Sequence, residues 1–204
     1  CGSFRGSKSH GGLDRRMTEN DSFFDTNVIV NYANFTEQTT NNIIHRCFVY
    51  INNKKGKFII SFYVRKELDG ILEKRAIINK VVSDSIKKGS FYNSRQLSER
   101  DLPYAKKQYE NLKYKKKAQD ILFEELDHFR TRVYLFRNKL LDKTELLESE
   151  IYISLVNVIR EFIEDYSDCK VLASAIQIQQ SQEQFLFVTA DRHIDSGSYN
   201  FIEN

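Results

Sequence analysis

Short apolar runs alternate along this chain with longer stretches of helical periodicity. The runs at 22–24, 58–60 and 185–188 are rich in aromatic and β-branched residues, which favour buried strands. The segments after the first two runs place apolar residues three and four positions apart, so helices are predicted from about residues 28, 36 and 63. A further helix is predicted over residues 165–180. Strands that alternate with helices indicate a parallel sheet with right-handed crossovers.

The middle of the chain carries a different pattern, which predicts a helical insertion at about residues 90–163. A seam of apolar residues alternates steps of four and three, as in coiled coils: Leu122, Leu126, Phe129, Val133, Phe136 and Leu140. A second stripe extends from Leu147 to Phe162. Together they predict one long helix from Pro103 and an antiparallel helical pair over residues 103–163. Such a seam forms a core or receives a partner helix, so a protein partner such as an antitoxin, or a homodimer, stays open.

Acidic residues recur at the junctions between strands and helices. Asp25 and Asp191 each follow a short apolar strand, and Glu67 and Asp168 each lie near the start of a helix. Any one of them alone fits a helix cap or a solvated surface residue. In a parallel sheet, however, all four would gather at one edge, where their charges repel strongly unless a cation offsets them. Oxygen-only ligands favour Mg²⁺ or Mn²⁺ over zinc.

Four short motifs, in this order, resemble the PIN domain, a family of metal-dependent nucleases. They are residues 24–29 (Phe-Asp-Thr-Asn-Val-Ile), Ser61 to Leu68, residues 168–175, and the ending Val-Thr-Ala-Asp at 188–191. The resemblance implies an α/β, three-layer fold with a central parallel sheet of four to five strands. The predicted helical insertion lies outside the match.

The resemblance also implies an endoribonuclease that uses Mg²⁺ or Mn²⁺ to cut RNA phosphodiester bonds. Asp25, Glu67, Asp168 and Asp191 would be the catalytic and metal-binding acids, with Asn27 and Thr189 orienting them. Asp165 is an extra acid that would bind a second metal or cap its helix. The alternative is a PIN-like module that binds RNA or protein without cutting. Phosphatases that form an aspartyl phosphate are disfavoured, because Asn27 stands where they need an acid.

Positive charge is concentrated before the apolar seam. Residues 90–117 contain eight Lys and Arg against three Asp and Glu, interleaved with four tyrosines. Phosphate backbones attract such charge, and aromatic rings stack on unpaired bases. A solvated helix face is an equally open interpretation. The candidate nucleic-acid-binding residues are Lys106, Lys107, Lys113, Lys115, Lys116 and Lys117.

Length and composition set the outer limits. The chain has 204 residues, 41% of them apolar and 29% charged, with a net charge of +3, which suits one domain over residues 17–204. Residues 1–16 lack periodicity, and we expect a leader or disordered tail with natural translation beginning at Met17. No apolar run approaches the ~20 residues of a membrane span. Three cysteines without a pairing pattern indicate a reducing compartment, so a cytoplasmic location is expected.

Overall fold

The computed structural model describes residues 21–140, 151–181 and 185–190. The predicted leader and Met17 therefore lie outside the described residues. In chain order the described elements are β1 (Asp21–Phe24), α1 (Thr26–Ala33), α2 (Asn42–Asn53), β2 (Phe58–Ile59), α3 (Phe62–Lys88), α4 (Leu102–Leu112), α5 (Ala118–Arg137), α6 (Ile153–Arg160), α7 (Tyr166–Ser181) and β3 (Phe185–Val188). None of these helices combines the length and apolar composition that a bilayer crossing requires.

The described strands form one parallel sheet in the order β2-β1-β3. Phe23 of β1 pairs with Ile59 on one side and with Phe187 on the other. The central strand is apolar on both faces because helices cover it, as is usual for parallel sheets. Phe24 is fully buried, and its ring centroid lies 4.7 Å from that of Phe58 and 5.3 Å from that of Phe136. The strand positions and their parallel direction are thus as the apolar runs predict.

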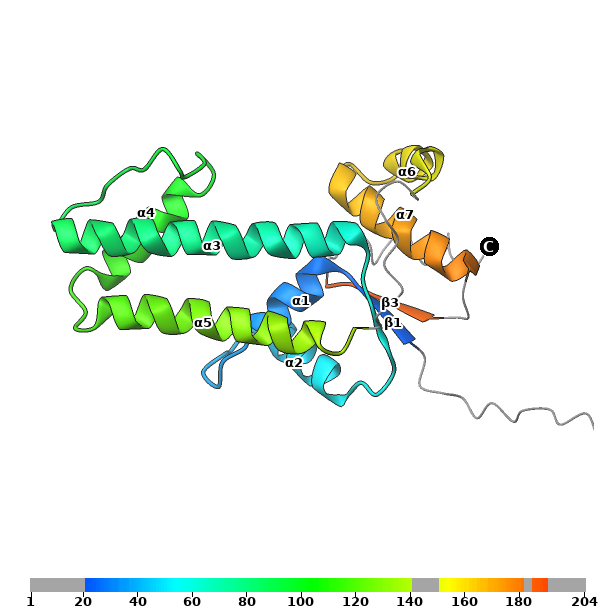
Figure 1. Cartoon of the computed structure of the whole chain (residues 1–204), viewed down its shortest axis with the longest axis horizontal. Helices are drawn as coiled ribbons and strands as arrows, with labels where there is room; N and C mark the ends of the chain where they lie inside the picture. The colour runs from blue at the N-terminus through cyan, green and yellow to red at the C-terminus, as the bar shows by residue number, and fades with distance from the viewer. Residues whose placement is uncertain (1–20, 141–150, 182–184, 191–204) are drawn as a thin grey trace, which may run out of the picture.

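A helical arm extends away from the sheet. Figure 1 shows α3 and α5 running side by side toward the left, with α4 crossing α3 near its far end, while the sheet, α6 and α7 lie at the right. We define the helical arm as residues 78–122, because buried side chains from Ile78 to Leu122 form its own core. The helix α3 belongs to both parts: Val64 and Leu68 pack in the sheet core, and Val82 packs in the arm.

The ends of α3 follow simple sequence signals. Ser61 caps its start, and the side chain accepts a hydrogen bond from the Val64 N–H (3.3 Å). Lys87 and Lys88 lie in its last turn, where cations are favoured by the helix dipole. Gly89 ends the helix at φ 70°, a left-handed conformation that glycine adopts without the Cβ clash. A continuous helix of this length fixes the arm relative to the sheet.

The predicted fold class is wrong. Helices account for 65% of the described residues, in seven helices, and the sheet has three strands there rather than the four to five of a PIN-like three-layer fold. The physical reason lies in the pattern of apolar residues outside the three strand runs. They recur with helical spacing, so their apolar faces pack helix against helix, as in the pairs α1 with α2, α6 with α7, and α3 with both α4 and α5, and they add no further strand to the sheet.

The single long helix from Pro103 and the antiparallel pair over residues 103–163 are also wrong. The helix α4 ends at Leu112, the chain turns through residues 113–117, and α5 begins at Ala118. The seam is nevertheless core, because Leu122, Phe129 and Phe136 are buried. It packs against α3 and α1, whereas α6 packs against α7. Residues 141–150, between α5 and α6, lie outside the described part of the chain.

Candidate active site at the carboxyl edge of the sheet

Asp25 lies where the central strand ends and α1 begins. Its side chain is only 4% exposed, and both carboxylate oxygens accept hydrogen bonds. Oδ1 accepts from the Thr26 N–H (2.6 Å), which caps α1, and Oδ2 accepts from the Thr189 hydroxyl (2.8 Å), just beyond β3. A buried carboxylate is costly unless it is hydrogen-bonded, so these donors let Asp25 occupy this position. Ligands bind at this edge of open parallel sheets.

Glu67 reaches the same edge from the second turn of α3. Its Oε2 accepts from the Thr26 hydroxyl (2.5 Å), and its Oε1 accepts from the Ser167 hydroxyl at the start of α7. Asp69 points elsewhere and pairs with Arg137 (2.5 Å), because two helical positions correspond to a rotation of ~200°. Glu67 and Asp69 therefore face different parts of the molecule, and only Glu67 belongs to this edge.

The start of α7 brings two more acids. The Asp165 Oδ1 accepts from the N–H groups of Ser167 (2.7 Å) and Asp168 (3.4 Å), so this carboxylate caps the helix. Asp168 is half-buried and directly follows Ser167. Burial and the nearby charges of Asp168 and Asp165 raise the pKa of the Cys169 thiol, whose Sγ donates to the Ile163 carbonyl (3.3 Å). Cys169 is therefore a packed, protonated thiol.

Asn27 ties the end of β3 to α1. Its Oδ1 accepts from the Ala190 N–H (2.9 Å), and its Nδ2 donates to the Thr189 hydroxyl (3.4 Å), which itself donates to Asp25. Asn27 and Thr189, the two predicted orienting residues, thus contact each other, and Thr189 contacts Asp25 directly. Asp191, the fourth predicted acid, lies outside the described residues and directly follows Ala190 in the sequence.

We call the connected set Asp25, Thr26, Glu67, Ser167 and Thr189 the Glu67 network. Hydrogen bonds connect Asp25 and Thr26, at the junction of β1 and α1, with Glu67 of α3, Ser167 of α7 and the residue after β3, although Thr189 and Asp25 are 164 residues apart. The sequence analysis does not assign Thr26 or Ser167 to the site. The available signal was their place: each is a hydroxyl residue adjacent in sequence to one of the predicted acids.

Carboxylates and hydroxyls are hard oxygen donors, which suit Mg²⁺ or Mn²⁺. Within residues 21–140, 151–181 and 185–190, no three Asp, Glu, His or Cys side chains lie close enough together to hold a metal ion. The predicted set of four acids also includes Asp191. Carboxylate oxygens such as those of Asp25 and Glu67 carry more than one lone pair, so they can accept a hydrogen bond and bind a cation at the same time. The donor chemistry at this edge therefore fits a hard cation.

The predicted basic residues lie elsewhere. Lys106 and Lys107 are exposed on α4, and residues 113–117 form the turn between α4 and α5. This turn is at the left-hand end of the arm in Figure 1, the end at which α3 also stops. Glu67 and Lys88 are 21 positions apart along α3, which corresponds to ~30 Å. The structure thus does not bring the lysines to the Glu67 network.

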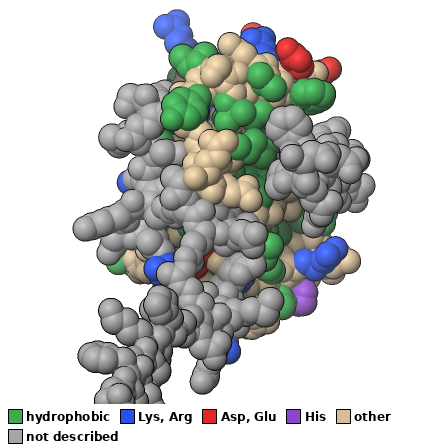
Figure 2. All heavy atoms as spheres, turned by 90° about the vertical axis from the view of Figure 1, so that its right-hand side faces the viewer, with side chains coloured by type: hydrophobic (Ala, Val, Ile, Leu, Met, Phe, Trp, Pro, Cys, Tyr) green, Lys and Arg blue, Asp and Glu red, His purple; other side chains and the backbone are tan. Residues whose placement is uncertain are grey.

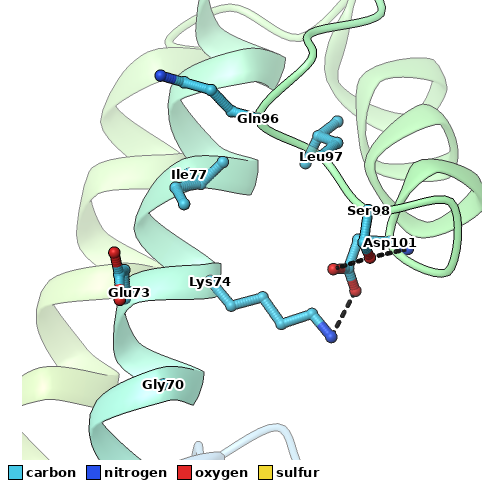
Figure 3. A pocket seen from close by; sticks show the side chains of 8 residues that line it. All are labelled: Gly70, Glu73, Lys74, Ile77, Gln96, Leu97, Ser98 and Asp101. Atoms are coloured by element: carbon cyan, nitrogen blue, oxygen red, sulfur yellow. Dashed lines mark hydrogen bonds and ion pairs between the residues drawn. The ribbon is translucent and has the colours of Figure 1, made fainter.

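A separate hollow of about 340 Å³ lies between α3 and the segment that leads into α4. Figure 3 shows Lys74 reaching across it to Asp101, with an ion pair of 2.6 Å. The Ser98 hydroxyl also donates to Asp101 (2.5 Å). Hydrogen bonds from Lys74 and Ser98 lower the pKa of the Asp101 carboxyl. These contacts explain how the segment is held against α3.

The end of the molecule that carries α6 is partly apolar on its surface. Figure 2 shows hydrophobic side chains gathered in the upper part of this face, the side on which α6 and α7 lie in Figure 1. Tyr152, Ile153, Val158 and Phe162 are the exposed apolar residues in and beside α6. They extend the apolar stripe that packs α6 on α7.

Comparison of the chain with protein-family models, with curated proteins and with solved structures found no match. The candidate site therefore stands on its geometry and on the motifs of the chain itself.

Proposed function

We propose that this chain hydrolyses phosphodiester bonds, with RNA as the substrate class, at the edge that holds Asp25, Glu67 and Asp168. The supporting observation is the Glu67 network, which gathers residues from four separate segments at the carboxyl end of the central strand. A buried aspartate at the end of the central strand needs donors to be tolerated there, and the chain supplies them from α1 and from the residue after β3. The motif resemblance to metal-dependent nucleases supports the same activity independently of the overall fold.

The residues have distinct parts in the proposed reaction. Asp25, Glu67 and Asp168, with Asp191, would hold Mg²⁺ or Mn²⁺, which supplies charge neutralisation at the phosphate and a more acidic water. Thr189 fixes the rotamer of Asp25, and Thr26 and Ser167 fix both oxygens of Glu67. Fixed acceptors lose little further freedom when a cation binds, so the site is largely organised before substrate arrives.

The test is cleavage of a fluorogenic single-stranded RNA with Mn²⁺, with Mg²⁺ and with EDTA. We expect cleavage that requires a divalent cation and falls at least 100-fold in Asp25→Asn, as expected when a metal-binding carboxylate is removed. Asparagine keeps the acceptor for the Thr26 N–H, so the helix cap survives. The matched control is Asp21→Asn, the same change at the opposite end of β1, where Asp21 accepts from the Lys57 N–H (2.9 Å).

Metal binding is measured separately by titration calorimetry with Mn²⁺ on the full chain. The proposal predicts heat of binding in the wild type and in Asp21→Asn, and its loss in Asp25→Asn. Metal-independent cleavage, or cleavage that survives in Asp25→Asn, would contradict the assignment of the site. Tight RNA binding with no cleavage under any divalent cation would favour the alternative of a binding module that does not cut.

A further inference from the structure

The turn between α4 and α5 concentrates positive charge that the fold does not neutralise. It contains Lys113, Lys115, Lys116 and Lys117. Lys113 pairs with Glu110 (2.5 Å), whereas the other three make no ion pair within the described part of the chain. All three are exposed. The end of α3 adds more charge nearby, since Ile86 packs against the same small core as Leu112 and Ala118 and is followed by two further lysines.

Lys117 is a poor choice of residue for the structure alone. Its φ of 64° lies in the left-handed region, where it is the one non-glycine residue among those described and where Asn or Gly is more comfortable. It also occupies the cap position of α5 without making a side-chain cap, although Ser, Thr, Asn and Asp are preferred there. A cation at the positive end of a helix is further disfavoured. Unfavourable local choices of this kind point to a role outside folding.

An exposed aromatic ring stands within the same turn. Tyr114 is 87% exposed, and the Lys113 Nζ lies 4.9 Å from its ring centroid. Large aromatic side chains contribute little to folding when they are this exposed. A ring beside several free ammonium groups matches the way proteins hold single-stranded nucleic acid, with phosphates on cations and a base stacked on the ring.

We propose that this turn, together with Lys87 and Lys88, binds single-stranded nucleic acid, with Tyr114 stacking on an unpaired base and Lys115 to Lys117 contacting phosphates. The site is remote from the Glu67 network, at the other end of α3. This proposal adds a substrate-binding site to the proposed nuclease. It rests on the proposed function only in the expectation that the bound strand is then cut. We favour a strand with unpaired bases over an acidic protein or an anionic membrane. The last two ligands need only positive charge, whereas unpaired bases also use the exposed ring of Tyr114.

The experiment is fluorescence anisotropy of labelled oligo(U) with the full chain in EDTA, which separates binding from any cleavage. Removing Lys115, Lys116 and Lys117 together, each replaced by Gln, should reduce the slope of log Kd against log salt by about 2, since single strands give ~0.7 per phosphate contact. The matched control changes Lys54, Lys55 and Lys57 to Gln, an equal loss of charge in the loop before β2, and should leave the slope nearly unchanged. Equal weakening by the two triple variants would overturn the proposal.

Two single substitutions separate binding from folding. Lys117→Asn should match or exceed the wild-type midpoint of thermal unfolding, because Asn tolerates the left-handed conformation and caps helices, yet it should bind oligo(U) more weakly. Tyr114→Leu should weaken binding about 5-fold or more, and Tyr114→Phe should retain it, as stacking requires. Unchanged affinity in both Lys117→Asn and Tyr114→Leu would overturn the proposal.

Parallel arms identify the ligand. Oligo(dT) tests whether DNA replaces RNA, and tight binding of either single strand supports the site. Polyglutamate tests an acidic protein, and vesicles of phosphatidylcholine and phosphatidylserine test a membrane surface. Preference for polyglutamate or vesicles over both oligonucleotides would overturn the assignment. Because no divalent cation is present, binding here and cleavage at Asp25 succeed or fail independently.

Discussion

The sharpest test of the site's architecture is a double-mutant cycle between Thr26 and Glu67. Thr26→Val removes the hydroxyl that donates to the Glu67 Oε2 and keeps the side-chain shape. Glu67→Gln replaces one of the two carboxylate oxygens with an amide NH₂ group, so the side chain keeps a single oxygen acceptor. If the carboxylate holds α1 and α3 together as the structure indicates, the two changes should not be independent.

The magnitude follows from burial and bond type. Thr26 is buried, and a hydrogen bond to a carboxylate contributes about 1.5–3 kcal/mol, toward the lower end here because Glu67 is half-exposed. Thr26→Val should therefore lower the free energy of unfolding by about 2 kcal/mol, a fall in Tm of ~4–8 °C for a chain of this size. The coupling energy of the cycle should be about 1 kcal/mol, as is usual for residues in contact.

The assay is urea unfolding of all four proteins followed by circular dichroism at pH 7. Asp69→Asn serves as the control, because it removes an exposed ion pair with Arg137 two residues along the same helix and should change stability by no more than ~0.5 kcal/mol. A coupling energy indistinguishable from zero would refute the claim that Thr26 and Glu67 hold each other, and the network would lose its central link.

Three other changes test the fold, each measured by the free energy of unfolding. Phe24→Ala should lower it by ~3–5 kcal/mol, because the ring is fully buried between two other phenylalanines; a loss below ~1 kcal/mol would contradict that packing. Gly70→Ala should raise it by ~0.5–1 kcal/mol, because a Cβ there meets no atom within 4 Å; destabilisation would refute this. In Asp101→Asn, urea titrations between pH 5 and 3 should show a shallower loss of stability than in the wild type. The folded pKa of Asp101 lies below the unfolded value of ~4, so its contribution is present above that value and is lost as the pH falls through the folded pKa. An identical pH profile in the variant would contradict this.

The sequence predicts the positions of the strands and of the acids Asp25 and Glu67, but not how the helices pack around the sheet. Asp25 and Glu67 are predictable as site residues because an acid directly after an apolar run, or just inside the next helix, is recognisable from the sequence alone. The short range of that signal is also its limit. Whether α5 packs on α3 or on α6 depends on the fit between apolar faces that are far apart in the sequence. Phe129 would be a buried core residue in either arrangement, so its position in the pattern does not distinguish them. The seam of α5 therefore packs against α3 and α1, rather than against the helix that follows it in the sequence.

The break at residues 113–117 illustrates a second limit. One helix is predicted through this region because Pro103 suits a helix start and a seam of helical spacing begins at Leu122. No glycine or proline marks the turn in the sequence. The left-handed conformation there, which glycine usually adopts, is adopted by Lys117. Ser167 is missed by the sequence analysis because its contact with Glu67 joins residues 100 positions apart, which no local pattern indicates.

The pairing of β1 with β3 has a consequence for how the molecule is made. During translation the central strand emerges early, yet its partner at Phe185–Val188 and the Thr189 hydroxyl that steadies Asp25 are made some 160 residues later. The arm, whose contacts are local, can assemble while the ribosome is still working, whereas the carboxyl edge of the sheet waits for distant chain. A nascent chain shorter than about residue 189 therefore lacks the assembled edge, which delays any chemistry there until synthesis has passed that point.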